Sequence, residues 1–303
     1  MEKYKQYIEL NWWTVNKRTV ELWMQNFGER QDLAHLILDN IIFYNKKQLK
    51  SYTRQLINRL KENIYVDARL ANNFVFVNDS VLENYWIDYL SKARFMPAAL
   101  PGDVGSSAYQ VISYWRSELE CDERVITDIR TIEEQYQNGI RKFILVDDFS
   151  GSGQQMLKVL KQKVAFAGKV VELGNLHKIK SDVEIVIAVY VIHRRAKKIL
   201  TRLYPGIKVL YIDILNADFD FLNSKSPIYD SFGYKSKDKN EAVKVIKVIQ
   251  EDLITKDLNL HALINYDLHI PIVFEHGCPN NTLNLLFAHT EQWNQLFRRG
   301  NEV

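Results

Sequence analysis

The sequence of 303 residues has little cysteine, proline and glycine, with 2, 6 and 12 of them respectively. Two cysteines, Cys121 and Cys278, are too few for a disulfide framework and are typical of a reducing compartment. Scarce proline and glycine argue against a long disordered linker. No apolar run reaches the ~18 residues of a membrane span. The charged stretch 1–5 lacks the apolar core of a signal peptide. These absences predict a cytoplasmic protein without a membrane segment.

The sequence also lacks a strong excess of charge of either sign. Its 40 basic and 37 acidic residues give a net charge of +3, so the charge balance does not indicate a nucleic-acid partner. Apolar residues make up 47% and charged residues 25%, which is ordinary for a globular protein. The length is that of one large domain, or of one domain with an appended helical part.

The most informative stretch runs from residue 142 to residue 155 and reads Lys-Phe-Ile-Leu-Val-Asp-Asp-Phe-Ser-Gly-Ser-Gly-Gln-Gln. Its apolar residues 143–146 predict a short buried strand that is closed by Asp147 and Asp148. A loop of small residues, 150–153, follows, and the apolar positions after it predict a helix. The stretch is neither a Walker A loop nor a dinucleotide-binding Gly-x-Gly-x-x-Gly motif.

This order of elements suits a ligand that carries hydroxyls and a phosphate. Carboxylates at the carboxyl end of a strand, here Asp147 and Asp148, accept hydrogen bonds from neighbouring hydroxyls such as those of a ribose, or help to hold Mg²⁺. Glycines let backbone N–H groups approach a phosphate, and a helix N-terminus adds partial positive charge. The alternative is that the acidic pair and the Gly/Ser turn only cap the next helix, or form an unrelated metal site.

Alternating strand and helix patterns follow this stretch and predict a parallel sheet with crossover helices. We therefore expect an α/β fold with an N-terminal helical region, divided into residues 1–80 and 81–303. A Pro/Gly/Ser-rich loop is expected at 95–107. Strands are expected at 183–192 and 208–213, and helices within 18–65 and at 81–90, 108–119, 124–136, 196–203 and 241–253.

The strand, the Asp147-Asp148 pair and the following loop resemble the phosphoribosyl pyrophosphate (PRPP) signature of type I phosphoribosyltransferases. The resemblance implies that the two carboxylates face the ribose hydroxyls, act in catalysis and hold Mg²⁺ indirectly. It also implies that the following loop binds the 5′-phosphate. Gln154 stands where the family often has glycine, and Gln155 where it usually has threonine. The implied loop residues are Ser150, Gly151, Ser152, Gly153, Gln154 and Gln155.

In type I phosphoribosyltransferases, a loop earlier in the chain contacts the pyrophosphate. The resemblance places Gly105, Ser106 and Ser107 in this role, through their backbone N–H groups. The alternative is that these serines only cap the helix expected at 108–119. Active enzymes of the family carry a long flexible loop before the acidic motif, whereas residues 111–136 of this chain have helical patterns.

A narrower resemblance is to phosphoribosyltransferase-like proteins of bacterial conflict systems. The acidic motif carries it together with three other segments: Trp23–Phe27, Pro279–Leu283 and Trp293–Arg299. This resemblance implies a role in anti-phage defence. The N-terminal helices are a candidate surface for a protein partner, with Trp12-Trp13 as the anchor if these side chains are exposed.

Three functions agree with these observations. The first is a Mg²⁺-dependent transferase or hydrolase that acts on PRPP, a ribose phosphate or a nucleotide. The second is a sensor that binds such a ligand without turnover, which Gln155 and the helical patterns of residues 111–136 favour. The third is an interaction subunit of a defence complex in which the pocket is vestigial.

Overall fold

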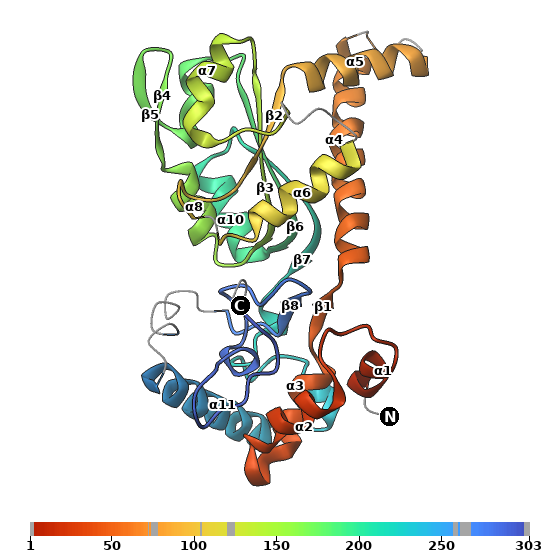
Figure 1. Ribbon diagram of the computed structural model, residues 1–303, viewed down its shortest axis with the longest axis vertical. Coiled ribbons are helices and arrows are strands. Elements are labelled where there is room, and N and C mark those ends of the chain that lie inside the picture. Colours follow the sequence, from red (N-terminus) through yellow and green to blue (C-terminus); the bar gives the residue numbers. More distant parts are fainter. Residues whose placement is uncertain are drawn as a thin grey trace. The chain divides into compact units, whose positions relative to one another are not determined.

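The computed structural model describes residues 3–71, 73, 78–103, 105–119, 125–256, 260 and 268–299. The chain divides into two compact units (Figure 1). The first unit comprises residues 1–46 and 215–303, and the second unit comprises residues 47–214. The boundary expected at residue 80 lies inside the second unit. The two compact units differ from the expected division into residues 1–80 and 81–303, because the C-terminal part of the chain folds with the first 46 residues.

The second unit is built on a four-stranded sheet of order β2-β3-β6-β7. These strands are β2 (Ala93–Pro97), β3 (Lys142–Ser150), β6 (Glu184–His193) and β7 (Lys208–Leu215). β3 pairs in parallel with β2 on one side and with β6 on the other. The expected α/β fold, a parallel sheet flanked by helices, is confirmed.

Helices cover both faces of this sheet, which explains why β3 and β6 are almost continuously apolar. On one face, Phe143 and Leu145 of β3 join a core formed with α7, α8, α9 and α10. On the other face, Trp115 of α6 packs against Phe95 of β2, and Thr53 of α4 hydrogen bonds to Tyr190 of β6. These helices are α4 (Lys46–Ala71), α6 (Ala108–Leu119), α7 (Ile132–Gln137), α8 (Gln154–Leu160), α9 (Leu176–Ile179) and α10 (Arg194–Leu203). The unit also contains α5 (Asp79–Ser91) and the hairpin of β4 (Lys163–Phe166) and β5 (Lys169–Glu172).

The connections that leave β2 and β3 run to opposite faces of the sheet. β2 is followed by α6 on one face, and β3 by α8 on the other (Figure 1). After α6 the chain returns to the free edge of β2, where Ile126 forms a parallel bridge with Phe95. In open α/β sheets, ligands bind at such a switch point, beyond the carboxyl ends of the strands. The topology therefore predicts a ligand site at the segments that follow β2 and β3.

The first unit joins segments from the two ends of the chain. Its helices are α1 (Lys3–Glu9), α2 (Lys17–Gln25), α3 (Gln31–Asp39) and α11 (Ser236–Lys256). The strand β1 (Ile42–Tyr44) pairs in parallel with β8 (Ile272–Phe274). Trp13 and Trp23 are buried in a core that also contains Leu285 and Phe297. Tertiary packing rather than local sequence therefore links the N-terminal helices to the end of the chain.

Three expectations about local structure are wrong. Residues 42–44 form a strand within the expected helical region, because their partner β8 lies near the other end of the chain. The loop expected at 95–107 begins later, because residues 95–97 belong to β2. The helix expected at 124–136 is shorter, because α7 begins at Ile132 and Ile126 bridges to β2. Within the described residues, no helix is both long enough and apolar enough to cross a membrane.

Candidate functional site

Asp147 and Asp148 lie near the carboxyl end of β3, in the middle of the sheet. The expectation that they close the strand is wrong, because β3 continues to Ser150. Pairing with β6 holds this extension in place, with Asp147 opposite Val189 and Ser150 opposite Ile192. Both carboxylates are buried. The sheet therefore places two acidic groups side by side at the switch point, on rigid backbone.

A hydrogen bond joins the acidic pair to the loop that follows β2. The hydroxyl of Ser107 donates to Oδ1 of Asp148 at 3.0 Å. Ser107 directly precedes α6, which begins at Ala108. Its backbone carbonyl accepts from the first turn of this helix, while its side chain is left to contact the carboxylate. The two segments that the sequence singled out, 105–107 and 147–155, thus meet at Asp148.

The two carboxylates strongly influence each other. Burial, and then the charge of Asp148, raise the pKa of Asp147 well above its ordinary value. Oδ1 of Asp147 also accepts a hydrogen bond at 3.0 Å from the backbone N–H of Asp148. A raised pKa means that Asp147 retains its proton more readily than an exposed aspartate does. The pair is suited to bind hydroxyls or a cation, either of which relieves the repulsion between the carboxylates.

The loop after β3 turns sharply into α8. Gly153 has a φ of +80°, and a Cβ at this position would lie 3.3 Å from Cα of Ala196 in α10. Only glycine adopts this conformation without strain, so the residue brings the loop backbone close to α10. Gly151 and Ser152 of this loop are also buried. α8 begins at Gln154, which is exposed, and Gln155 is half-buried.

Ser150 carries a buried hydroxyl that has no hydrogen-bond partner among the described residues. A buried hydroxyl without a partner is costly, and in natural proteins such groups often mark functional positions. Ser150 is the last residue of β3 and lies two positions after Asp148. This hydroxyl is therefore a further group at the site that is able to bind a ligand.

The remaining expected residues lie before α6. Gly105 is exposed, and Ser106 is half-buried. The hydroxyl of Ser106 accepts from the backbone N–H of Ala108 at 3.4 Å, as the capping alternative predicts. Ser106 and Ser107 thus differ in role, since only the Ser107 hydroxyl reaches the acidic pair in this structure.

Tyr190 is a neighbour of the site that the sequence did not reveal, because it lies inside an apolar run of β6. Its hydroxyl is 2.7 Å from the hydroxyl of Thr53 in α4. Burial raises the pKa of Tyr190, with a smaller contribution from the negative charge of Asp148. His193, at the end of the same strand, accepts through Nδ1 a hydrogen bond from the backbone N–H of Arg195 at 3.2 Å. This bond fixes the start of α10 next to the Gly153 turn.

The acidic pair fits a magnesium ion that is bound together with a substrate. Mg²⁺ is usually held by one or two carboxylates, with water and phosphate oxygens completing its coordination. Asp147 and Asp148 supply the carboxylates. No group of three or more His, Cys, Asp or Glu side chains with metal-binding geometry occurs in the part of the chain that the structure describes. The two carboxylates could therefore form part of a Mg²⁺ site, with other oxygen ligands completing the coordination.

The three other segments that carry the resemblance to conflict-system proteins come together in the first unit. The indole N–H of Trp23 and that of Trp293 both donate to the carbonyl oxygen of Leu285, at 2.7 and 3.2 Å. Nη2 of Arg299 donates to Oδ1 of Asn280 at 2.8 Å. Segments 23–27, 279–283 and 293–299 thus form one packed structure, which gives the Pro279–Leu283 segment a structural role.

The structure of orotate phosphoribosyltransferase from Aeropyrum pernix is similar at 12% sequence identity and a TM-score of 0.27, over 49% of this chain and 68% of that chain. No curated protein matches the chain. The model of the PRTase-CE family matches residues 20–299, which include the acidic motif and segments of both units. The chain therefore belongs to the PRTase-CE family, and is phosphoribosyltransferase-like.

Proposed function

We propose that the carboxyl edge of the sheet in the second unit binds PRPP, or a related ribose phosphate or nucleotide. In this proposal Asp147 and Asp148 accept hydrogen bonds from the two ribose hydroxyls. The backbone of residues 150–155 binds the 5′-phosphate. Residues 105–107 contact the pyrophosphate. Family membership and the resemblance of the acidic motif to the PRPP signature support this assignment.

The observation that carries the proposal is the hydrogen bond from Ser107 to Asp148. In PRPP the pyrophosphate and the hydroxyls are attached to the same small ring, so the protein segments that bind them must be neighbours. Residues 105–107 and the acidic pair are far apart in the sequence, yet this contact makes them neighbours. A simple helix cap would not require the Ser107 side chain to point at a buried carboxylate.

In the reaction that this site favours, a nucleophile forms a bond to the anomeric carbon while the bond from that carbon to the pyrophosphate oxygen breaks. Positive charge develops on the sugar, and the buried carboxylates of Asp147 and Asp148 stabilise it at short range. Either of them accepts the proton that the nucleophile loses. Mg²⁺, when bound, neutralises charge on the pyrophosphate. With water as the nucleophile the same arrangement hydrolyses the ligand.

A thermal-shift titration tests the binding step. PRPP, ribose 5-phosphate and nucleotides are added with and without Mg²⁺ to the wild type and to the Asp147→Asn/Asp148→Asn variant. A ligand at about 100 times its Kd stabilises the folded protein by about 2.7 kcal/mol, which gives a visible shift. We expect a shift in the wild type that the double variant loses. Asp252→Asn, an exposed change in α11, is the control that retains it. A wild type that responds to none of these ligands contradicts the proposal.

A second candidate is a sensor that binds the same ligand without turnover. It is favoured by Gln155, whose half-buried side chain occupies a position where related enzymes carry the smaller threonine. Pyrophosphate release from PRPP separates the two candidates, since an enzyme releases it with kinetics that depend on Asp147 and Asp148. Ligand-induced stabilisation without release of pyrophosphate or of a base identifies the sensor.

We further propose that the protein acts in the cytoplasm as part of an anti-phage defence system. The combination of motifs that resembles conflict-system proteins supports this role, and 41% exposure of Trp12 leaves a candidate contact for a protein partner. Trp13 is 4% exposed and belongs to the core, so only Trp12 of the tryptophan pair is exposed enough to contact a partner. Plaque counts on cells that carry the native locus test the proposal. We expect a locus that encodes the Asp147→Asn/Asp148→Asn variant to lose protection. Equal protection by this locus and by the native locus contradicts the proposed defence role.

A further inference from the structure

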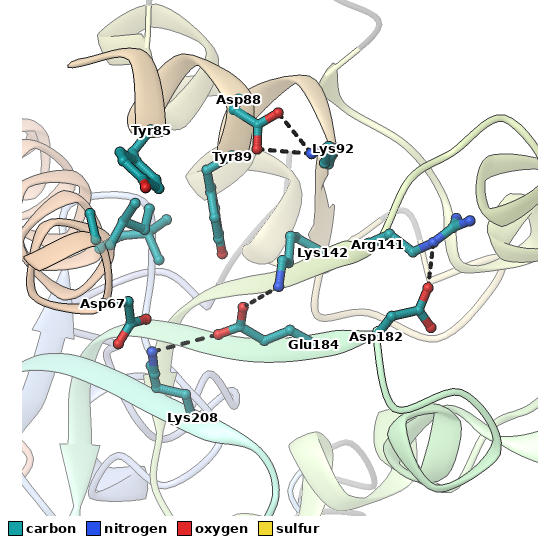
Figure 2. Close-up of a pocket in the computed structure, with 13 residues that line it drawn as sticks. Asp67, Tyr85, Asp88, Tyr89, Lys92, Arg141, Lys142, Asp182, Glu184 and Lys208 are labelled. Carbon is teal, nitrogen blue, oxygen red and sulfur yellow. Dashed lines mark hydrogen bonds and ion pairs between the residues drawn. The ribbon is translucent and has the colours of Figure 1, made fainter. Parts of the chain in front are cut away.

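A cavity of about 400 Å³ lies at the amino-terminal edge of the sheet in the second unit (Figure 2). The acidic pair occupies the opposite, carboxyl edge, so the two sites are separate. Lys142, Glu184 and Lys208, which are the first residues of β3, β6 and β7, line one side of the cavity. Helices α4 and α5 form the other side. Its volume is in the range of pockets that bind small molecules.

The side of the cavity formed by the strands carries one uncompensated positive charge. Glu184 is shared by two ammonium groups, Nζ of Lys142 at 3.1 Å and Nζ of Lys208 at 3.6 Å. These side chains are only partly exposed, so solvent screens them incompletely. With two cations around one carboxylate, these three side chains together have a net positive charge and can attract an anion.

Tyr89 of α5 points a buried hydroxyl into this cavity. The residue is 8% exposed, and its hydroxyl has no hydrogen-bond partner among the described residues. Figure 2 shows the ring directed toward Lys142 and Glu184. Burial, and then the charges of Glu184 and Asp67, raise the pKa of Tyr89 well above its ordinary value. The hydroxyl therefore stays protonated and is available to donate to an acceptor on a ligand.

Asp67 of α4 supplies the opposite charge. The other aspartates of the cavity are paired, Asp88 with Lys92 at 2.7 Å and Asp182 with Arg141 at 2.8 Å. Asp67 forms no ion pair or hydrogen bond with any residue in the described parts of the chain. It is exposed, so a ligand can reach it. The cavity thus presents an unpaired carboxylate on α4 and an excess of positive charge on the strands.

An apolar strip of α4 lies next to Asp67. Leu60, Ile64 and Ala68 are buried and recur at every fourth position, so they share one face of the helix. All three line the cavity. A ligand that uses both charged regions would also bring an apolar group against this strip.

We propose that the cavity binds a free α-amino acid with an apolar side chain. Its carboxylate accepts a hydrogen bond from the Tyr89 hydroxyl and lies beside Lys142 and Lys208. Its ammonium group pairs with Asp67, and its side chain packs against the apolar strip of α4. This site is independent of the ribose-phosphate site, and a bound amino acid would act on the protein from the opposite edge of the sheet.

Isothermal titration calorimetry of the whole chain with L-leucine and L-phenylalanine tests the proposal. N-acetyl-L-leucine lacks the cation and L-leucinamide lacks the anion, so each removes one of the two charge contacts. We expect the free amino acids to bind, and both blocked compounds to bind about tenfold more weakly or worse. No binding of either free amino acid overturns the proposal, and so does equal binding of the blocked compounds.

Substitutions then locate the ligand. Tyr89→Phe and Asp67→Asn should each weaken L-leucine binding by about tenfold, while thermal melts verify that both variants fold. Asp79→Asn, at the start of α5 and outside the cavity lining, is the matched control that keeps wild-type affinity. The Asp147→Asn/Asp148→Asn variant should also bind L-leucine normally, which separates this site from the ribose-phosphate site. Unchanged affinity in both Tyr89→Phe and Asp67→Asn overturns the assignment.

Discussion

Ser107 donates a hydrogen bond to Asp148 across 41 positions of sequence, and this bond connects the segment after β2 to the acidic pair of β3. Because Asp148 is buried, its carboxylate depends on protein donors in place of water. The contact therefore affects both the stability of the second unit and the arrangement of the site.

Replacement of Ser107 by alanine should lower the free energy of unfolding by about 1–3 kcal/mol, because a buried carboxylate loses a donor. It should also weaken the binding of PRPP. Urea denaturation and thermal-shift titration measure the two effects. Ser106→Ala is the control, since the Ser106 hydroxyl only accepts a long hydrogen bond from Ala108. Equal effects of the two substitutions would show that the contact with Asp148 contributes nothing specific.

The raised pKa of Asp147 predicts how stability depends on pH. The folded protein holds this proton more tightly than the unfolded chain does, whose aspartates titrate near a pKa of about 3.9. Between these two pKa values the folded state carries the extra proton, so the free energy of unfolding falls as pH rises, and it levels off above the folded-state pKa.

Asp147→Asn removes this titration while it keeps the shape of the side chain. We expect the variant to be more stable than the wild type at neutral pH, with a difference that shrinks as the pH approaches about 4. Urea denaturation of both proteins across this pH range is the measurement. A constant difference between the two curves would mean that Asp147 titrates in the folded protein as it does in the unfolded chain.

Elements with a strong local apolar pattern were predicted well from the sequence. β6, β7, α5, α10 and α11 occur close to their expected positions because each pattern is local and strong. β1 and β2 were not predicted, since they are short and are stabilised by partner strands elsewhere in the chain. The first unit was not predicted for the same reason, because it is formed by segments from the two ends of the chain.

The candidate site was predictable only in its parts. The strand, the acidic pair and the small residues of the loop are visible in the sequence, because their chemistry and order are local. That Ser107 rather than Ser106 contacts Asp148 depends on how α6 leaves the sheet, which no local pattern encodes. The buried Ser150 hydroxyl was expected in a loop, and it belongs to the strand because pairing with β6 extends β3.

The Gly153 turn offers a test of how closely the loop packs against α10. Both Gly153→Ala and Gly168→Ala place a side chain at a positive φ, which costs about 1–2 kcal/mol. A Cβ at Gly168 meets no atom within 4 Å, whereas one at Gly153 lies 3.3 Å from Ala196. Chemical denaturation should therefore show a loss for Gly153→Ala that is greater by about 1 kcal/mol. Equal losses would mean that α10 moves to accommodate the new Cβ without any loss of stability.

The three tryptophans Trp12, Trp23 and Trp293 allow the core of the first unit to be tested with one kind of substitution. Trp23 is fully buried and donates to the Leu285 carbonyl at 2.7 Å, so Trp23→Phe should lower the free energy of unfolding by about 1–3 kcal/mol. Trp293→Phe should cost less, because its bond to the same carbonyl is longer, at 3.2 Å. Trp12→Phe is the matched control, and its effect should stay within about 0.5 kcal/mol because the side chain is exposed. Urea denaturation followed by circular dichroism ranks the three variants. A cost for Trp12→Phe equal to that for Trp23→Phe would contradict the assignment of Trp23 to the shared core of the two chain ends.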